Sequence, residues 1–161
     1  DTQVHPDPTA EEIAEIAVVA ARHCRRFGLE PKVALLSHSQ FGNLDIPSGR
    51  KMRRAMEILD SEDRGFAYEG EMHADAALDP EIRDRIFPNS RIEGVANILI
   101  LPNADAASGM RNVLKQMSGA LEVGPILMGM GNRAHIVTPS ITARGLLNIA
   151  ALASTPMTSY A

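Results

Sequence analysis

The feature that most restricts the fold of this chain is the segment Lys32 to Ser37 (KVALLS), whose central residues VALL form a continuous apolar run. The segment directly follows a predicted amphipathic helix. Thr9 and Glu12 stand three residues apart, the spacing of a capping box that begins a helix, and Gly28 supplies its left-handed stop. An apolar run of this length after a helix is typical of an interior strand in a parallel sheet. The segment therefore predicts a β-strand buried on both faces.

Helical and extended patterns alternate through the rest of the chain. Further helices are predicted over residues 48–59, 80–86, 104–118 and 144–153, and further strands over residues 66–69, 95–101, 121–127 and 135–137. For helix 104–118, Asn103 is the predicted cap, and the predicted inner face comprises Met110, Val113, Leu114 and Met117. The alternation predicts an α/β fold with three layers, in which helices cover both faces of a mostly parallel sheet. We expect one α/β domain over residues 1–153 and a flexible tail over 154–161.

Composition excludes several classes of function. The net charge of −4 leaves no basic footprint for nucleic acid, and the single cysteine, Cys24, permits no internal disulfide and fits a reducing cytoplasm. No apolar run approaches the length of a membrane span, and no secretory leader is seen. We therefore expect a cytoplasmic protein with no membrane partner. Because the chain lacks an initiator Met, we also expect it to be the middle of a longer polypeptide.

The predicted ligand-facing groups lie where strands end. Ser37, His38 and Ser39 follow the first strand, and Asn103 follows the strand 95–101. In open α/β sheets, ligands bind beyond the carboxyl ends of the strands, so these residues are candidate lining groups. The alternative is an ordinary turn whose hydroxyls satisfy its own backbone, with His38 a structural histidine.

A second candidate segment is GPILMGMGNRAHIVTPS, residues 124–140, in which Gly and Pro interrupt extended runs. Such residues allow the backbone to come close to a ligand. The candidate binding residues in this segment are Gly124, Pro125, Met128, Gly129, Thr138 and Ser140. His135 in the same segment is more simply a strand-edge histidine than a catalytic one.

Two charged clusters have simpler interpretations than binding. Arg50, Lys51, Arg53 and Arg54 are typical of a solvated helix surface, although a phosphate-bearing ligand would engage one or two of them. Glu69, Glu71, His73 and Asp75 do not have the spacing of a standard metal motif. We interpret the acidic cluster as helix caps with local hydrogen bonds, and we predict no metal site.

Four segments resemble one enzyme family. VALLSHSQFG (33–42), YEGEMHADAAL (68–78), ANILILPNADAA (96–107) and GPILMGM (124–130) are similar to the signature segments of phosphate acetyl/butyryltransferases. The resemblance runs from about Pro6 to Ala153 in the family's order and spacing. It covers the C-terminal half of a catalytic unit whose two α/β domains enclose coenzyme A.

Departures from the family pattern lie in the last third of the chain. Where those enzymes have Ser-Arg-Gly, this chain has Thr138, Pro139 and Ser140, and a later family Asp falls near Arg144 or Gly145. No Asp or Glu follows Glu122. Acetyl transfer needs a cation for the phosphate and a carboxylate to help deprotonate the thiol. The resemblance therefore implies that no residue of this chain is catalytic.

A narrower resemblance comes from the two ends of the domain, residues 1–28 and 135–152. They look like the C-terminal phosphotransacetylase-like domain of bacterial hybrid NADP-dependent malic enzymes, which are oxaloacetate-decarboxylating. This implies acetyl-CoA as an effector, regulation without turnover, and dimers formed through this half. NADP and Mg²⁺ or Mn²⁺ would belong to an N-terminal malic enzyme domain.

Two alternatives remain for the function. One is an active phosphate acetyltransferase that uses Thr138 and His135, and the other is a pure oligomerisation module with a vestigial pocket. In the family, the last helix packs on the other domain. The apolar residues of helix 141–153 are therefore expected to be partly exposed or covered by a partner; they are Leu146, Leu147, Ile149 and Leu152.

Overall fold

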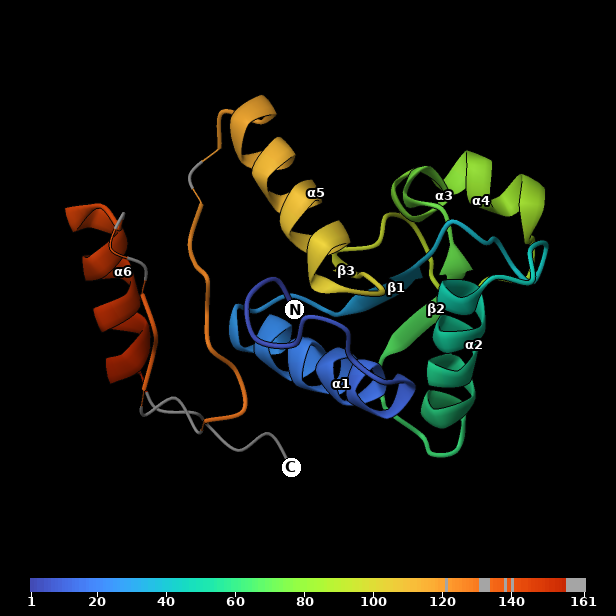
Figure 1. Cartoon of the computed structure of the whole chain (residues 1–161), viewed down its shortest axis with the longest axis horizontal. Helices are drawn as coiled ribbons and strands as arrows, with labels where there is room; N and C mark the ends of the chain where they lie inside the picture. The colour runs from blue at the N-terminus through green and yellow to red at the C-terminus, as the bar shows by residue number, and fades with distance from the viewer. Residues whose placement is uncertain (121, 131–133, 138, 140, 156–161) are drawn as a thin grey trace. The chain divides into compact units, whose positions relative to one another are not determined.

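The computed structural model in Figure 1 describes residues 1–120, 122–130, 134–137, 139 and 141–155. The chain divides into two compact units, Asp1–Gly109 and Met110–Ala161. Helix α5 (Ala104–Met117) crosses the division between the units. The prediction of a single domain over 1–153 with a tail after it stays a prediction.

The first unit contains a three-stranded parallel sheet. Its elements are α1 (Ala10–Arg26), β1 (Lys32–Leu36), α2 (Pro47–Asp60), β2 (Ala67–Met72), α3 (Ala74–Leu78), α4 (Pro80–Ile86) and β3 (Ile98–Ile100). The strand order is β2-β1-β3, and both pairings are parallel. The apolar run at the start of the chain therefore forms the central strand, as its composition predicts.

Helix α1 begins and ends where the sequence signals place it. The amide of Glu12 donates to Thr9 Oγ1 at 3.2 Å, and the amide of Thr9 donates to Glu12 Oε2 at 2.7 Å. After the helix, Gly28 takes a φ of 74°. The capping box and the glycine stop are both confirmed.

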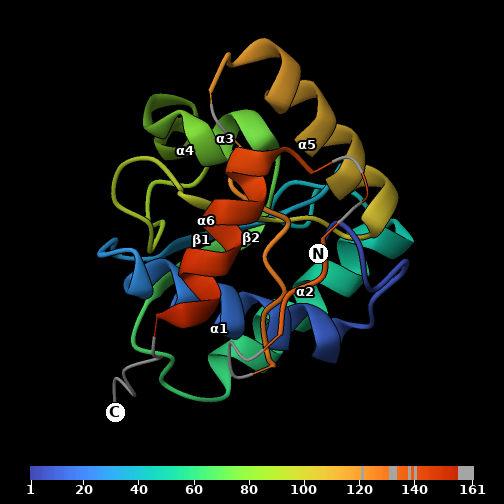
Figure 2. The same cartoon turned by 90° about the vertical axis from the view of Figure 1, so that its left-hand side faces the viewer.

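Both faces of β1 are buried, which explains its continuous hydrophobicity. Val33 and Leu35 belong to the core formed with α1 and α2, which includes Met52. Successive side chains of a strand point to opposite faces, so Ala34 and Leu36, also buried, face the other side. Figures 1 and 2 show α1 and α2 on one side of the strands and α3 and α4 on the other. The α/β fold with helices on both faces is confirmed.

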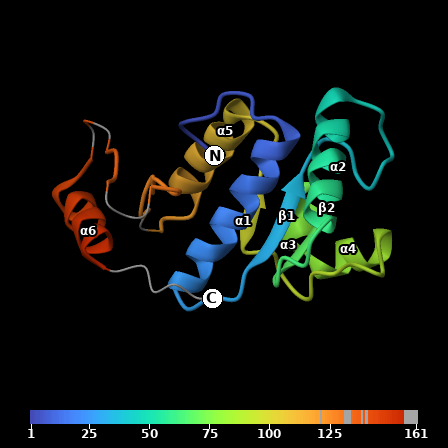
Figure 3. The ribbon, with the colours of Figure 1, turned by 90° about the horizontal axis from the view of Figure 1, so that it is seen from below.

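Two strands differ in length from their predictions. β2 continues through Gly70 to Met72, because Glu69 and Glu71 are buried in ion pairs that allow acidic residues inside a strand. β3 is shorter than residues 95–101, because the amide of Ala96 donates to the carbonyl of Ala77 rather than to the sheet. Figure 3 shows β1 and β2 from below, running beside each other.

The second unit contains the remainder of α5 and helix α6 (Ala143–Ser154). Residues 122–128 and 134–137 form no strand, so the strands predicted there are wrong over their described residues. Apolar sequence alone does not make a strand, which also needs a partner for its backbone hydrogen bonds. The Gly124-Pro125 pair weakens the first segment further, because proline has no amide hydrogen to donate.

The predicted inner face of α5 is also not buried. Val113, Leu114 and Met117 are exposed, Met117 to 80%. In α6, Ile149 is buried whereas Leu146 and Leu147 are exposed. The helical periods are correct, but periodicity does not show whether a neighbouring element covers the apolar face. No helix in the described part of the chain is both long and apolar enough to cross a membrane.

Candidate functional site

The strongest candidate site is the carboxyl edge of the sheet in the first unit, where a loop leaves β1 at Ser37. The amide of Ser37 donates to the carbonyl of Met72 at 3.0 Å, which extends the contact between β1 and β2 by one residue. The hydroxyl of Ser37 accepts a hydrogen bond from the amide of Ser39 at 3.0 Å. Within the described residues the hydroxyl proton of Ser37 has no acceptor, so it remains able to donate to a ligand.

Two histidines lie together at this edge. The rings of His38 and His73 stack with centroids 6.1 Å apart and an interplanar angle of 11°. His73 Nε2 lies 2.9 Å from the carbonyl oxygen of His38. Because a carbonyl only accepts, Nε2 of His73 must carry a proton. The His38 side chain is exposed and His73 is half-buried, so His38 is the more accessible of the pair.

Ser39 lies differently from its two neighbours. Its side chain is fully buried, and its hydroxyl lies 2.5 Å from Oε1 of Glu71. The same carboxylate oxygen accepts from the amide of Gly42 at 3.0 Å and from Nη1 of Arg53 at 2.7 Å. A place for Ser39 in a ligand wall stays a prediction, and the structure gives its hydroxyl an internal partner instead.

The acidic cluster is partly misinterpreted by the sequence argument. Glu69 and Glu71 are not caps: their buried carboxylates pair with the partly exposed guanidiniums of Arg91 at 3.2 Å and Arg53 at 2.7 Å. Only Asp75 bonds locally at a helix start, accepting from the amide of Ala76. The described residues contain no group of three His, Cys, Asp or Glu that could hold a metal ion.

The basic cluster of α2 is fully engaged with carboxylates. Its four ion pairs are Arg50–Asp45 at 2.6 Å, Lys51–Asp7 at 2.5 Å, Arg53–Glu71 at 2.7 Å and Arg54–Glu57 at 2.8 Å. Three of these pairs have exposed partners and contribute little. The Arg53 pair is different, because the side chain of Glu71 is only 1% exposed.

Asn103 follows the neighbouring strand β3, at the same edge of the sheet as Ser37. Its side-chain oxygen accepts from the amide of Ala106 at 2.9 Å, which confirms its predicted role as the cap of α5. Since β3 pairs in parallel with β1, Asn103 and Ser37 both follow carboxyl ends of adjacent strands. The structure therefore places Ser37, His38 and Asn103 at one edge of the sheet.

The remaining predicted residues belong to the second unit. Gly124 and Gly129 have φ values of 145° and 85°, a range that favours glycine, and Met128 is exposed. Pro125 lies in the same irregular segment. Thr138 and Ser140 lie outside the described residues. The ring nitrogens of His135 are buried and have no hydrogen-bond partner among the described residues.

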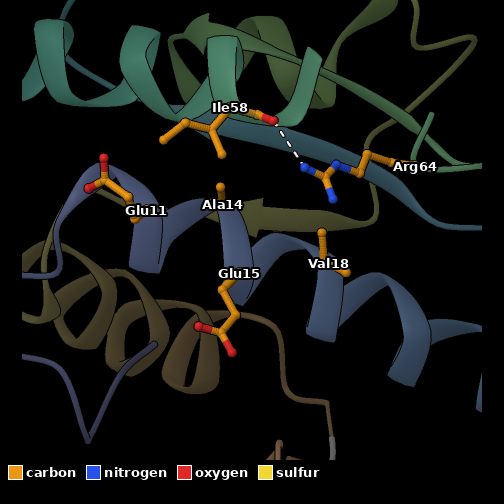
Figure 4. Close-up of a pocket in the computed structure, with 6 residues that line it drawn as sticks. All are labelled: Glu11, Ala14, Glu15, Val18, Ile58 and Arg64. Atoms are coloured by element: carbon orange, nitrogen blue, oxygen red, sulfur yellow. Dashed lines mark hydrogen bonds between the residues drawn. The ribbon is translucent and has the colours of Figure 1, made fainter. Parts of the chain in front are cut away.

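A shallow pocket of about 250 Å³ lies elsewhere, between α1 and α2 (Figure 4). Its lining residues are Glu11, Ala14, Glu15, Val18, Ile58 and Arg64. In Figure 4 the guanidinium of Arg64 donates to the carbonyl of Ile58, at 3.0 Å. None of the predicted binding residues line this pocket. It is a groove between two packed helices rather than part of the sheet edge.

An electrostatic cluster surrounds the first half of β2. Asp60 accepts from the hydroxyl of Tyr68 at 2.9 Å, and Arg91 stacks over the Tyr68 ring at 4.5 Å. Desolvation alone would raise the pKa of Asp60, but the hydrogen bonds from Arg91 and Tyr68 and the Arg91 charge lower that pKa overall. Burial and the bond to Asp60 raise the pKa of Tyr68. These groups stabilise the fold and lie apart from the β1 loop in sequence and in bonding.

Sequence reasoning missed the pairing of Glu71 with Arg53 and the bonds of Glu71 to the β1 loop. The only available signal was the segment Tyr-Glu-Gly-Glu-Met, in which acidic residues stand inside an extended pattern. Acidic residues are rarely fully buried unless they are paired, so the pattern called for a basic partner. The identity of that partner, 18 residues earlier on α2, required the tertiary structure.

Comparisons with known proteins show the family to which the chain is similar. The model of the family "phosphate acetyl/butaryl transferase" matches residues 1–154. The chain is 47% identical over 153 residues to an NAD-dependent malic enzyme of Rhizobium meliloti, and 47% identical over 154 residues to an NADP-dependent malic enzyme of Escherichia coli. Each match covers 95% of this chain but only 20% of the relative.

Among solved structures, a phosphotransacetylase from Streptococcus pyogenes is similar, with a TM-score of 0.89 and 31% identity. That match covers 95% of this chain and 46% of the Streptococcus chain. The chain thus spans about a fifth of the length of these malic enzymes and just under half of this phosphotransacetylase. The family resemblance read from the sequence is confirmed.

Proposed function

Since this chain belongs to the phosphate acetyl/butaryl transferase family, we propose that it is an acetyl-CoA-binding regulatory domain of a malic-enzyme-type protein, without acetyl transfer of its own. The observation that carries the proposal is the pairing of two facts. The chain matches malic enzymes at 47% identity, and no Asp or Glu follows Glu122. A transferase fold without the late carboxylate is suited to binding rather than to turnover.

The geometry of the first unit supports ligand binding at the sheet edge. Ser37 has a hydroxyl proton free to donate among the described residues, and His38 is exposed beside it. Phosphate and carbonyl oxygens of a coenzyme A thioester are acceptors that such donors recognise. Asn103, which follows the adjacent strand β3, would extend this wall in the proposed complex.

Loss of acetyl transfer follows from the chemistry that is missing. The attacking thiol must lose a proton, and the phosphate must be held by a cation. Glu71 and Arg53 are charged side chains that are hydrogen-bonded to the β1 loop. They form an ion pair with each other at 2.7 Å. The alternative of an active phosphate acetyltransferase would need a base and a cation from other residues.

Regulation would work through the equilibrium between arrangements of the whole protein. A ligand that binds one arrangement better shifts the population toward it, and a coupling of about 1–3 kcal/mol is typical. NADP or NAD and a divalent metal would bind the remainder of the polypeptide. The exposed Leu146 and Leu147 are consistent with our further proposal that this half forms a dimer.

The test uses the natural polypeptide that carries this domain and measures two quantities. Calorimetric titration with acetyl-CoA should show binding, and malate-dependent reduction of the nicotinamide coenzyme should change over the same concentration range. Ser37→Ala should weaken both effects about tenfold, as expected for one lost hydrogen bond to a charged ligand. Ser61→Ala, at the end of α2, is the matched control and should leave both unchanged.

Three results would contradict the proposal. Robust formation of acetyl phosphate from acetyl-CoA and phosphate would show an active transferase. Absence of binding at millimolar acetyl-CoA would leave an oligomerisation module. Binding without any change in malate oxidation would remove the regulatory role.

A further inference from the structure

We infer that Glu71 is the positioning residue of the ligand loop, defined as residues 37–44, and that it fixes the direction in which Ser37 and His38 face. The identity of the ligand rests on the proposed function, but the positioning role is a property of the fold alone. The Glu71 side chain is buried and does not face solvent. It acts through the loop that it holds.

Three hydrogen-bond donors converge on one carboxylate oxygen of Glu71. Oε1 of Glu71 accepts from the hydroxyl of Ser39 at 2.5 Å, the amide of Gly42 at 3.0 Å and Nη1 of Arg53 at 2.7 Å. The Glu71 side chain is only 1% exposed. Charge-assisted hydrogen bonds away from water are stronger than those between neutral groups. The carboxylate therefore ties the middle of the loop to β2 and, through Arg53, to α2.

Three further hydrogen bonds join the loop to residues at the end of β2. The amide of Phe41 donates to the carbonyl of Glu71 at 2.7 Å, and the ring of His73 donates to the carbonyl of His38 at 2.9 Å. With the bond from Ser37 to Met72, residues 71–73 hold the loop at three further points. Backbone and side-chain groups of residues 71–73 thus bind the same short loop.

The loop also adopts an unfavourable backbone conformation that these hydrogen bonds help to stabilise. Phe41 has a φ of 46°, a region that a non-glycine residue rarely adopts. Its ring stacks on Phe87 with centroids 4.5 Å apart. The first turn of α2 also approaches closely, since a Cβ on Gly49 would lie 2.8 Å from Cβ of Ser39. The loop is therefore packed between β2, α2 and Phe87.

The consequence concerns the groups that face outward. Because Ser39 is held inward, its amide is placed to donate to Ser37 Oγ, which leaves the Ser37 proton for an outside acceptor. The Ser37 hydroxyl can therefore donate its proton outward while one of its lone pairs is already engaged by Ser39. We infer a ligand whose contact at this point is an acceptor oxygen, such as a phosphoryl or thioester carbonyl oxygen.

The chain offers a matched control on the same strand. Glu69 is also a buried acid of β2, and it pairs with Arg91 rather than with the loop. Glu69→Gln and Glu71→Gln make the same chemical change two residues apart. Ser39→Ala removes the hydroxyl that bonds Glu71 and Leu44 but keeps the carboxylate and Arg53, so it is a second variant in case Glu71→Gln does not fold.

The first readout is hydrogen exchange of the full chain without ligand. Glu71→Gln and Ser39→Ala should raise exchange in peptides covering 37–44 by about tenfold, as expected when a charge-assisted bond is lost. Glu69→Gln should leave these peptides unchanged and act around Arg91 instead. Equal exchange of the ligand loop in Glu71→Gln, Ser39→Ala and Glu69→Gln would overturn the inference.

The second readout separates this inference from the proposed function. If the wild-type polypeptide binds acetyl-CoA, Ser39→Ala should weaken binding more than Glu69→Gln, even where Glu69→Gln lowers the melting temperature as much. Equal weakening in variants of equal stability would reduce Glu71 to a purely structural role. If the wild type does not bind acetyl-CoA, the proposed function fails, and the exchange experiment still decides the positioning role.

Discussion

Gly70 in β2 lies so close to Leu35 in β1 that a Cβ on Gly70 would stand 2.8 Å from both the carbonyl oxygen and the Cβ of Leu35. The pairing between the strands also shifts here, from Leu35 opposite Gly70 to Leu36 opposite Met72. Such a shift is a bulge, which often marks a close approach of two backbones. The missing side chain of Gly70 is therefore a condition for the sheet to form next to the candidate site.

We predict that Gly70→Ala lowers the free energy of unfolding by more than about 2 kcal/mol, because the clash involves backbone that has little freedom to move. Denaturant titration followed by circular dichroism measures the change. Gly109→Ala in α5 is the control, since nothing lies within 4 Å of its added Cβ. That variant should stabilise the helix by up to about 1 kcal/mol. A Gly70→Ala protein as stable as wild type would contradict the close approach.

Arg83 is predicted to hold α3 and α4 in place. Its guanidinium is buried and donates to the carbonyls of Ala76 at 3.2 Å, Ile92 at 3.0 Å and Gly94 at 2.6 Å. Arg83→Met would leave these carbonyls without donors, at a cost of about 3 kcal/mol or more. Arg85→Met, on the exposed side of α4, should cost less than about 0.5 kcal/mol. Chemical denaturation of the two variants gives the comparison.

The lowered pKa of Asp60 predicts a pH dependence of stability. A carboxylate whose pKa is lower when folded stabilises the protein above its ordinary value of 3.8. That contribution is lost as the pH falls through the folded pKa. Asp60 is half exposed, so we expect Asp60→Asn to cost about 1 kcal/mol or less at neutral pH. The difference from wild type should shrink as the pH falls below about 4.

Unfolding free energies measured from pH 7 to pH 3 test this expectation. Tyr68→Phe removes one donor to Asp60 and should reduce the pH-dependent part without abolishing it. A difference between wild type and Asp60→Asn that stays constant over the whole range would show that Asp60 does not titrate differently on folding.

The exposed face of α6 predicts a change in association without a change in stability. Leu147 is 69% exposed, so Leu147→Glu should alter the free energy of unfolding by less than about 0.5 kcal/mol. It should weaken self-association measured by sedimentation velocity, because an exposed apolar face favours contacts between molecules. Ile149→Glu places a charge at a buried position of the same helix and should destabilise it by about 2 kcal/mol or more. Unchanged association in Leu147→Glu would exclude this face from a dimer contact.

The sequence by itself determined the local features of this protein. Thr9, Glu12 and Gly28 mark the ends of α1, and Asn103 marks the start of α5, because caps satisfy backbone groups only a few residues away. The composition of β1 predicted a central strand because burial on both faces requires a continuous apolar run. The family motifs, which combine many such local signals, identified the fold.

The tertiary structure alone decided what depends on distant residues. It paired Glu71 with Arg53, placed Leu35 against Gly70, and left Val113 and Leu114 of α5 exposed. It also left residues 122–127 outside any strand. Burial, ion pairing and strand formation each require a partner that the local sequence does not contain. Periodicity can therefore predict that a face is apolar or that a segment is extended, whereas the partner that completes it is set by the packing of the whole chain.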